Sequence, residues 1–371
     1  MLLKLKRWAF GAPTADHLEA LLDRLTSNGS GQSIRVGIVG PGWGQALVAR
    51  DAGQVAVDQS SATVPLLCLT KPVVAALAAS LVEVGRFDWD VPVAVWAPEL
   101  TAEGWSAVTA FDLLTHATTF PFDQPPIKLD GIASDSTIAE SLNAVPMPQP
   151  DRLGLVANYS VSWAWELLRL VLERSQGVSI GTLVHQYVAE PLGLSSLSLV
   201  VESADSRWLS MDPILAKVGA LLRPSRSLAP ANLMRWPGSF GALATPLDYA
   251  SFLNAISDSA IGESDFLTQS MALKLITAQR RNRVDSVTGD VAWGVGFAVE
   301  HRNAFSGLYK FGGGLSEATF GHFGLWNLAS FCDPLRGVSC CAFFDTPVEG
   351  QDHFARCFDL ARAVATDFEP I

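Results

Sequence analysis

The sequence is poor in positive charge and contains no long apolar run. Its 26 Lys and Arg residues are outnumbered by 37 Asp and Glu residues, which gives a net charge of −11. Such a chain has no basic surface to neutralise phosphates, so nucleic acids and anionic membranes are poor partners. The longest uncharged apolar stretch, residues 72–82, has eleven residues, whereas a membrane span needs about 20. The sequence therefore predicts neither a nucleic-acid-binding protein nor a membrane protein.

Cysteine is scarce and shows no metal-binding pattern. The five cysteines are an odd number, and four of them lie late in the chain without the spacing of metal ligands. The N-terminal segment carries basic residues but neither the apolar core nor the small-residue cleavage site of an export signal. We therefore expect a cytoplasmic protein with reduced thiols, no metal and no cofactor.

Hydrophobic periodicity predicts that the chain begins with a helix followed by strands. Residues 16–25 carry apolar side chains at the spacing of an amphipathic helix. Two apolar runs, 34–39 and 45–50, flank the glycine-rich segment 40–44, which is typical of a β-hairpin. A short third strand is expected over 54–58.

The middle of the chain has the pattern of helices. Residues 72–84 are apolar and rich in alanine, with Pro72 at the expected first helical position. A further helix is expected over 162–174. Another begins after Thr245, which is placed as an N-cap with Asp248 in the acidic position of a capping box.

Strand patterns return towards the C-terminus. The expected strands cover residues 293–300, 308–311, 326–332 and 338–345, and a last helix is expected over 352–367. Cys340 and Cys341 are adjacent in one of these strands, so their side chains should face opposite sides of the sheet.

The order of these elements predicts an α+β fold. Both ends of the chain can share one antiparallel sheet, flanked by the N- and C-terminal helices, with the helical block inserted between them. We expect a sheet lobe formed by residues 1–65 and 285–371, and a mainly helical lobe formed by residues 66–284. A hydrophobic content of 49% over 371 residues is sufficient for two such lobes.

A cysteine and a lysine stand three positions apart at the start of the helix over 72–84. On a helical turn, side chains at this spacing are neighbours, so Cys68 and Lys71 would lie side by side. A nearby amine and a helix N-terminus both stabilise a thiolate, and burial favours a neutral lysine that can act as a base. A nucleophile beside a base is the arrangement of covalent catalysis. The alternative is a small buried thiol that only packs the start of the helix.

The residues around Cys68 belong to a longer series of motifs. The first segments read CLTKPVVAALAASLVEVGRFDWDVPVAVWAPEL and VTAFDLLTHATTF. Later segments are Asn158-Tyr159-Ser160, SIGTLVHQYVAEPLGL, GSFGALATPLDYASFL and Gly321-His322-Phe323-Gly324. In this order the series resembles the superfamily of serine β-lactamases, penicillin-binding proteins and family VIII esterases, whose first motif is Ser-x-x-Lys. The resemblance implies a β-lactamase/DD-peptidase-like fold with the active site at the junction of the two lobes.

The same resemblance implies roles for individual residues. Cys68 occupies the position of the nucleophile, Lys71 that of the base that deprotonates it, and Tyr159 that of the tyrosine that relays the proton. His322 would join the proton network or lie near a substrate carboxylate. The backbone N–H groups of Cys68 and Leu325 would form the oxyanion hole, in which one donor typically contributes ~2.7–4 kcal/mol to the transition state.

Substrate contacts are also implied by the resemblance. His322 and Gly324 belong to the motif on the strand that borders the pocket, and Val161 holds the third position of the family's Tyr-x-Asn motif. Trp326 lies beside a matched motif, where it could line an apolar pocket. Ordinary core packing is the alternative for this tryptophan.

Two departures from the family pattern change the expected chemistry. Cys68 replaces a serine, and a thiolate gives a thioester, which is a good acyl donor. Val161 replaces an asparagine that would contact a substrate amide, which argues against β-lactams and ordinary peptides. The block LLTHATTF also lacks the family's closing glycine, so we expect a remodelled pocket rim.

Each candidate side chain also has a purely structural interpretation. His116 orders a loop in the family, and this is the role we expect for it here. Tyr159 could be a core tyrosine with a bonded hydroxyl, and His322 a hydrogen-bonded filler.

Four functions are compatible with these residues. The first is an acyltransferase that takes an acyl group from a small ester or thioester, which a carrier protein could present, and passes it to a small acceptor. The second is a hydrolase of the esterase or amidase type that uses water as the acceptor. The third is a catalytically silent binding protein on the same fold. The fourth is acid–base chemistry by Lys71 and Tyr159 without an acyl-enzyme.

Overall fold

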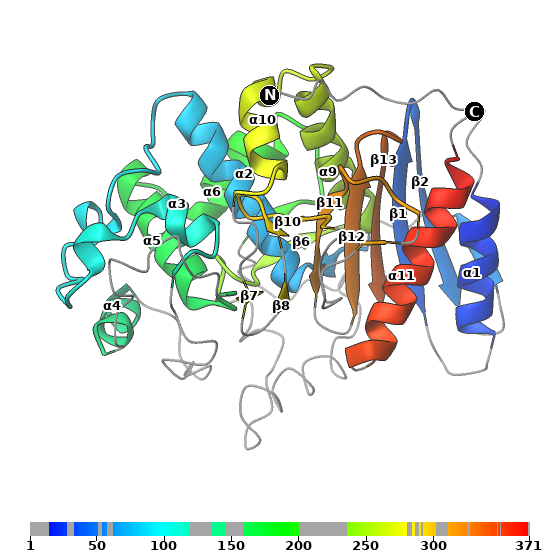
Figure 1. Cartoon of the computed structure of the whole chain (residues 1–371), viewed down its shortest axis with the longest axis horizontal. Helices are drawn as coiled ribbons and strands as arrows, with labels where there is room; N and C mark the ends of the chain where they lie inside the picture. The colour runs from blue at the N-terminus through cyan, green and yellow to red at the C-terminus, as the bar shows by residue number, and fades with distance from the viewer. Residues whose placement is uncertain are drawn as a thin grey trace.

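An eight-stranded antiparallel sheet built from both ends of the chain is the centre of the fold (Figure 1). The computed structural model describes residues 15–27, 33–50, 54–57, 62–118, 135–144, 159–199, 236–279, 284–285, 289–290, 292–301, 311–312, 314–324, 327–346, 348 and 350–369. The strand order is β3-β2-β1-β13-β12-β11-β10-β9, so the first and last strands of the chain meet in the middle of the sheet. This arrangement confirms the expected α+β class with an antiparallel sheet.

The N-terminal strands form the predicted hairpin. They are β1 (Ile34–Gly40), β2 (Trp43–Arg50) and β3 (Gln54–Val57). Gly42 has a φ of +68° in the β1–β2 turn, a conformation that glycine adopts without strain. The C-terminal strands are β9 (Ala292–Trp293), β10 (Ala298–Val299), β11 (Phe320–Gly324), β12 (Leu328–Asp333) and β13 (Val338–Phe344).

Helices cover both faces of the sheet. Helix α1 (Asp16–Thr26) packs against α11 (Gly350–Asp367), and α9 (Pro246–Ile261) contacts β1, β12 and β13 (Figure 1). The hydroxyl of Ser339 in β13 donates to the carbonyl of Ala250 in α9 at 2.7 Å, so Ser339 and Cys341, two positions further on, share the face towards α9. The two adjacent thiols therefore face opposite sides of β13, as strand alternation predicts.

Close packing of α9 against the sheet depends on a glycine in β1. A Cβ atom on Gly37 would lie 2.3 Å from backbone atoms of Pro246 and Leu247. The first turn of α9 can therefore approach the sheet only where β1 has no side chain.

The remaining helices lie beside the β9–β11 end of the sheet (Figure 1). They are α2 (Thr70–Glu83), α3 (Ala110–Leu114), α4 (Asp135–Asn143), α5 (Trp163–Gln176), α6 (Ile180–Val184), η5 (His185–Ala189) and α10 (Gln269–Ile276). Shorter turns are η1 (Leu67–Leu69), η2 (Val93–Val95) and η3 (Trp105–Ala107). The small strands are β4 (Val64–Pro65), β5 (Ser198–Leu199), β6 (Ala242–Ala244), β7 (Val284–Asp285) and β8 (Gly289–Asp290). The lobe boundaries at 65/66 and 284/285 stay a prediction.

The prediction of a single strand over 293–300 is wrong. Strands β9 and β10 pair with each other, and the N–H of Gly294 donates to the carbonyl of Phe297 within the tight turn between them. Gly296 has a φ of +76°, and a Cβ atom there would lie 2.3 Å from the Cβ of Ala75. The chain folds back at this turn, and the absence of a side chain at Gly296 allows α2 to pack closely against it.

Several other boundaries differ from the sequence prediction. Helix α2 begins at Thr70, so Pro72 is its third residue, because the turn η1 leads directly into it. The hydroxyl of Thr245 accepts the N–H of Asp248, but the Asp248 carboxylate accepts from Ser196 rather than closing a capping box. Of the strand expected over 308–311, only Phe311 lies within the described residues, and it is not in a strand.

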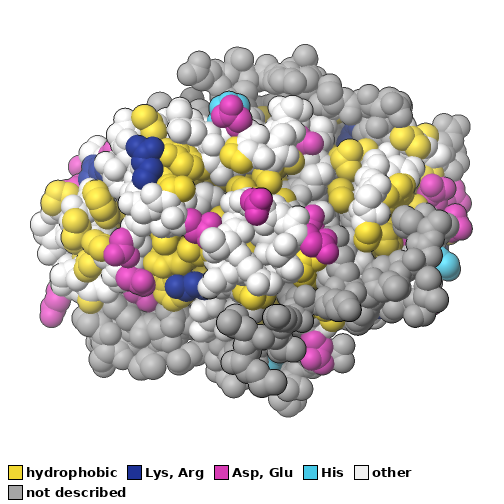
Figure 2. Space-filling view, turned by 90° about the horizontal axis from the view of Figure 1, so that it is seen from above, with side chains coloured by type: hydrophobic (Ala, Val, Ile, Leu, Met, Phe, Trp, Pro, Cys, Tyr) yellow, Lys and Arg dark blue, Asp and Glu magenta, His cyan; other side chains and the backbone are white. Residues whose placement is uncertain are grey.

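The described surface agrees with the acidic composition. Figure 2 shows acidic side chains spread over one face, where the basic side chains form no continuous patch. Across the described part of the chain, no helix combines the length and hydrophobicity that a membrane crossing requires. The same residues contain no group of three His, Cys, Asp or Glu side chains suited to a metal ion.

Candidate active site

Cys68 lies in the short turn η1, between the strand β4 and the helix α2. Its side chain is 5% exposed, and η1 packs against β11. Leu67, the preceding residue, has a φ of +47°, which is unfavourable for a residue with a Cβ atom. Such a conformation persists only where the surrounding structure holds it, and it is often found at functional sites.

Hydrogen bonds to a neighbouring strand hold this turn in place. The N–H of Leu66 donates to the carbonyl of Ala242, and the N–H of Ala242 donates to the hydroxyl of Thr70 at 3.1 Å. The residues on both sides of Cys68 are thus tied to β6. These contacts supply the restraint that the unfavourable backbone at Leu67 requires.

Lys71 is completely buried, and its amine lies close enough to Cys68 for the two side chains to interact electrostatically. Burial lowers the pKa of the Lys71 amine, and the negative charges of Cys68 and Glu166 partly oppose this shift. The amine also donates to the carbonyl of Ser239 at 3.4 Å. A buried amine with a lowered pKa can accept the thiol proton, as a base beside a nucleophile must.

Aromatic rings surround the Lys71 amine. Its nitrogen lies 5.0 Å from the ring centre of Phe240, 5.5 Å from that of Tyr159 and 5.9 Å from that of Trp165. Ring faces attract a cation, so the protonated form of the amine also has favourable contacts in this environment.

Tyr159 is buried next to this amine. Its ring stacks on Trp293 at a centroid distance of 5.5 Å and lies 4.8 Å from the ring of His116. The structure therefore brings the Cys68 sulfur, the Lys71 amine and the Tyr159 ring together, as the motif series predicts. Their catalytic roles stay predictions.

His116 orders the segment that carries Tyr159. The N–H of Ser160 donates to Nδ1 of His116 at 3.2 Å, and the His116 ring is completely buried. Burial lowers the pKa of His116 well below its usual value, with Lys71 and His322 as smaller causes. A neutral ring that accepts a backbone N–H has the structural role expected for this histidine.

His322 lies in β11, and its ring contacts those of Tyr159 and Trp293. Its ring is 6.0 Å from that of Tyr159 and 5.8 Å from that of Trp293, and Nδ1 donates to the carbonyl of Phe323 at 2.8 Å. Burial, helped by the charge of Lys71, lowers the pKa of His322 to about 3. The ring is therefore neutral near pH 7 and offers a substrate no positive charge.

The other predicted contact residues divide into two groups. Val161 is buried beside Tyr159, and Gly324 ends β11 opposite Leu328. Leu325 and Trp326 lie outside the described residues, so the second oxyanion donor and this pocket wall stay predictions.

A buried carboxylate near Lys71 was missed by the sequence reasoning. Glu166 of α5 is completely buried, and its Oε1 accepts the N–H of Ser239 at 2.9 Å and the hydroxyl of Ser239 at 2.7 Å. Burial raises the pKa of Glu166, whereas Arg169 and these hydrogen bonds act in the opposite direction. The only sequence signal was an acidic residue within the otherwise apolar run WAWELL.

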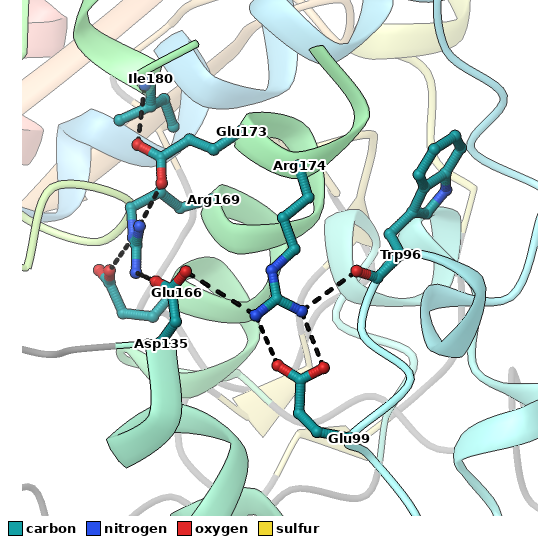
Figure 3. A network of polar contacts seen from close by, with 8 residues as sticks. All are labelled: Trp96, Glu99, Asp135, Glu166, Arg169, Glu173, Arg174 and Ile180. Atoms are coloured by element: carbon teal, nitrogen blue, oxygen red, sulfur yellow. Dashed lines mark hydrogen bonds and ion pairs between the residues drawn. The ribbon is translucent and has the colours of Figure 1, made fainter. Parts of the chain in front are cut away.

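Figure 3 shows how Glu166 is connected to the outside of α5. Nε of Arg169 donates to Glu166 at 3.2 Å, and the same guanidinium also binds Glu173 and Asp135. Arg174 continues the chain of ion pairs to Asp135 and Glu99. The buried carboxylate is thus held by one cation of its own helix, Arg169.

Comparison with known proteins places this arrangement in context. The model of the family described as Beta-lactamase matches residues 22–360. The chain is 27% identical over 345 residues to "Esterase EstB" from Burkholderia gladioli, covering 83% of each protein.

Solved structures show the same fold. A penicillin-binding protein homolog from Caulobacter crescentus has a TM-score of 0.77 at 22% identity, covering 96% of this chain and 99% of the other. A family VIII carboxylesterase has a TM-score of 0.72 at 19% identity, with the same coverage. "EstCE1, a hydrolase with promiscuous acyltransferase activity" has a TM-score of 0.70 at 19% identity, covering 94% of this chain and 98% of the other.

Proposed function

The chain belongs to the beta-lactamase family, and from this premise we propose that it is an acyl-transfer enzyme with Cys68 as its nucleophile. Its relatives include esterases and other hydrolases, which supports an enzyme of the esterase or hydrolase type. The observation that carries the finer proposal is the completely buried amine of Lys71, which interacts with Cys68 and lies 5.5 Å from the centre of the Tyr159 ring.

The proposed first half-reaction transfers the acyl group to sulfur. Lys71 takes the proton of the Cys68 thiol, and the thiolate attacks the carbonyl carbon of an ester or thioester. The negative charge on the carbonyl oxygen is held by the N–H of Cys68 and by the expected donor at Leu325. The C–O or C–S bond of the substrate then breaks, and the proton passes from Lys71 through the Tyr159 hydroxyl to the leaving group.

The second half-reaction regenerates the thiol. An acceptor hydroxyl, amine or thiol loses its proton through Tyr159 to Lys71 and attacks the thioester carbon. The S–C bond breaks, and the Cys68 sulfur recovers the proton. Transfer to such an acceptor is favoured over hydrolysis where water is scarce, which agrees with the 5% exposure of Cys68.

Hydrolysis is the second candidate, and the likeness to an esterase favours it. The same residues would act with water as the acceptor. A solved hydrolase of this fold is described as having promiscuous acyltransferase activity, so one apparatus can serve both acceptors.

The proposed substrate is a small ester or thioester without a required carboxylate. Val161 puts an apolar side chain where an asparagine would bind an amide, and His322 is neutral near pH 7. We propose cytoplasmic substrates, which a carrier protein could present. A silent binding protein would not need Lys71 and Tyr159 to stay gathered around Cys68.

Intact-mass measurement tests the proposal directly. Incubation with a p-nitrophenyl ester or an acyl thioester should add one acyl group, and peptide mapping should place it on Cys68 rather than on the four other buried cysteines. Cys68→Ala should abolish the adduct, and Cys332→Ala should leave it intact. No adduct on Cys68, or an equal rate in Cys68→Ala, would disprove covalent catalysis by this residue.

A further inference from the structure

A serine just before β6 links the buried carboxylate of Glu166 to the amine of Lys71. The N–H and the hydroxyl of Ser239 donate to Oε1 of Glu166, at 2.9 Å and 2.7 Å. The carbonyl of Ser239 accepts from the Lys71 amine at 3.4 Å. All three side chains are completely buried. The carboxylate and the amine are therefore joined through one residue, where their charges are screened far less than at the surface.

Close packing fixes the segment that carries this serine. A Cβ atom on Gly238 would lie 2.4 Å from the carbonyl oxygen of Trp165 in α5, the residue before Glu166. The segment can approach the backbone of α5 at this point because position 238 has no side chain. The hydroxyl of Ser239 also lies 3.0 Å from the carbonyl oxygen of Ser162. Ser239 is thus held against α5 both by its backbone neighbour and by its own side chain.

The hydrogen bonds of Glu166 are those of an ionised carboxylate. Its Oε1 accepts two from Ser239, and its Oε2 accepts one from Nε of Arg169 at 3.2 Å (Figure 3). Three donors around one carboxylate stabilise its charged form. They act against burial, which raises the pKa of Glu166. The geometry therefore favours a negative charge at Glu166, separated from the Lys71 amine by Ser239.

We propose that Glu166 is the counter-ion of Lys71, a positioning residue that stabilises the ammonium formed when Lys71 takes the proton of Cys68. The inference rests on the proposed function, which makes Cys68 the nucleophile and Lys71 the base. The proton moves from the sulfur to the amine nitrogen, which leaves a thiolate beside an ammonium. Burial alone disfavours both charges, whereas the carboxylate, joined to the amine by Ser239, favours the ammonium and thereby raises the share of thiolate.

Several other titratable groups surround this pair in the described part of the chain. Those that interact with Lys71 or Glu166 are Cys68, His116, Tyr159, Arg169 and His322, and Arg169 also pairs with Asp135 and Glu173. Burial lowers the pKa of both histidines, so their rings are neutral near pH 7. Within this set, Glu166 is the carboxylate that a single residue, Ser239, joins to the amine.

Alkylation of Cys68 by iodoacetamide measures the thiolate without requiring acyl transfer. The thiolate displaces iodide and an S–C bond forms, so the rate, followed by intact mass against pH, reports the share of thiolate. Glu166→Gln keeps the shape of the side chain but removes its charge. It should lower the plateau of the alkylation rate by about 10-fold, since a nearby opposite charge typically changes an ionisation equilibrium by this factor or more. Glu166→Asp shortens the side chain but keeps the charge, so it should retain most of the rate.

Two further variants complete the experiment. Ser239→Ala removes one of the three donors to the carboxylate and keeps every buried charge. It should lower the plateau in the same direction as Glu166→Gln by a smaller factor, and it carries the test in a chain that retains its buried ion pair. Glu99→Gln, at the far end of the same chain of ion pairs, should leave the plateau unchanged.

The outcomes separate the inference from the proposed function. The inference is overturned if Glu166→Gln or Ser239→Ala is alkylated as fast as the wild type at every pH. It is also overturned if Glu166→Asp loses more of the rate than Glu166→Gln, because shape rather than charge would then matter. If wild-type Cys68 is alkylated but accepts no acyl group from a p-nitrophenyl ester, the proposed function fails, and the order of the Glu166 variants still decides the inference. If wild-type Cys68 reacts with neither reagent, both fail.

Discussion

The Lys71 amine lies 5.5 Å from the centre of the Tyr159 ring, although the two residues are far apart in the sequence. The contact places the proposed base next to the proposed proton relay, inside an aromatic cluster that excludes water. The two roles can be tested separately by replacing one of these residues and keeping the other.

Removal of the buried amine should stop acylation of Cys68. Lys71→Met preserves the length of the side chain but cannot accept the thiol proton, and general base catalysis typically contributes ~10²–10⁴-fold. We expect a loss of acylation in this range, measured by intact mass against time. Lys274→Met is the matched control, because Lys274 also packs on aromatic rings, those of Trp89 and Phe111. A similar loss in both variants would contradict a specific role for Lys71.

Loss of the Tyr159 hydroxyl should affect turnover more than stability. Tyr159→Phe keeps the ring that stacks on Trp293, and it removes only the group that relays the proton. We expect kcat to fall by ~10²–10⁴-fold, while the urea midpoint changes little. A large shift of the midpoint with unchanged kcat would show instead that the hydroxyl is structural.

The charge of Glu166 should influence the pH dependence of acylation. Glu166 raises the pKa of Lys71, so Glu166→Gln should lower that pKa. A base with a lower pKa is deprotonated at lower pH, so the acidic limb of the acylation profile should move to lower pH. Glu173→Gln is the control on the same helix. Glu173 also pairs with Arg169 but is not among the groups that shift the pKa of Lys71, so this variant should leave the acidic limb unchanged. An unmoved limb in Glu166→Gln would indicate that Glu166 is already protonated.

The close approach of α2 to the β9–β10 turn should make Gly296 hard to replace. A Cβ atom there would lie 2.3 Å from Ala75 at a φ of +76°, whereas at Gly85, with a φ of +68°, it would meet nothing within 4 Å. Gly296→Ala should therefore cost about 1–3 kcal/mol more of the free energy of unfolding than Gly85→Ala, because of overpacking. Urea unfolding measures the difference, and equal losses would show that the packing at this turn relaxes freely.

The buried neutral histidines should make the protein less stable in mild acid. The pKa of His322 is about 3 in the folded protein, against ~6.5 in the unfolded chain. Between these values the unfolded state binds more protons, so stability rises with pH and is lost as the pH falls below ~6.5. From pH 7 to pH 5 this residue should cost about 2 kcal/mol. His322→Gln should therefore lose about 2 kcal/mol less of the free energy of unfolding between pH 7 and pH 5. His185→Gln, at an exposed position, should lose as much as the wild type.

Local pattern alone was sufficient for some features of this protein. Cys68 and Lys71 are neighbours because a spacing of three residues brings side chains together on any helical turn. The opposite orientation of Cys340 and Cys341 follows in the same way from the alternation of a strand. The hairpin at the N-terminus and the order of elements also depend on periodicity and turn residues, which each segment carries by itself.

Tertiary structure decided what surrounds these residues. Glu166 is a polar side chain whose importance comes from partners on other elements, Ser239 and, through it, Lys71. The break in the strand expected over 293–300 likewise depends on α2 packing against Gly296. Burial and long-range hydrogen bonds arise only when distant segments meet, so no single stretch of the sequence encodes them.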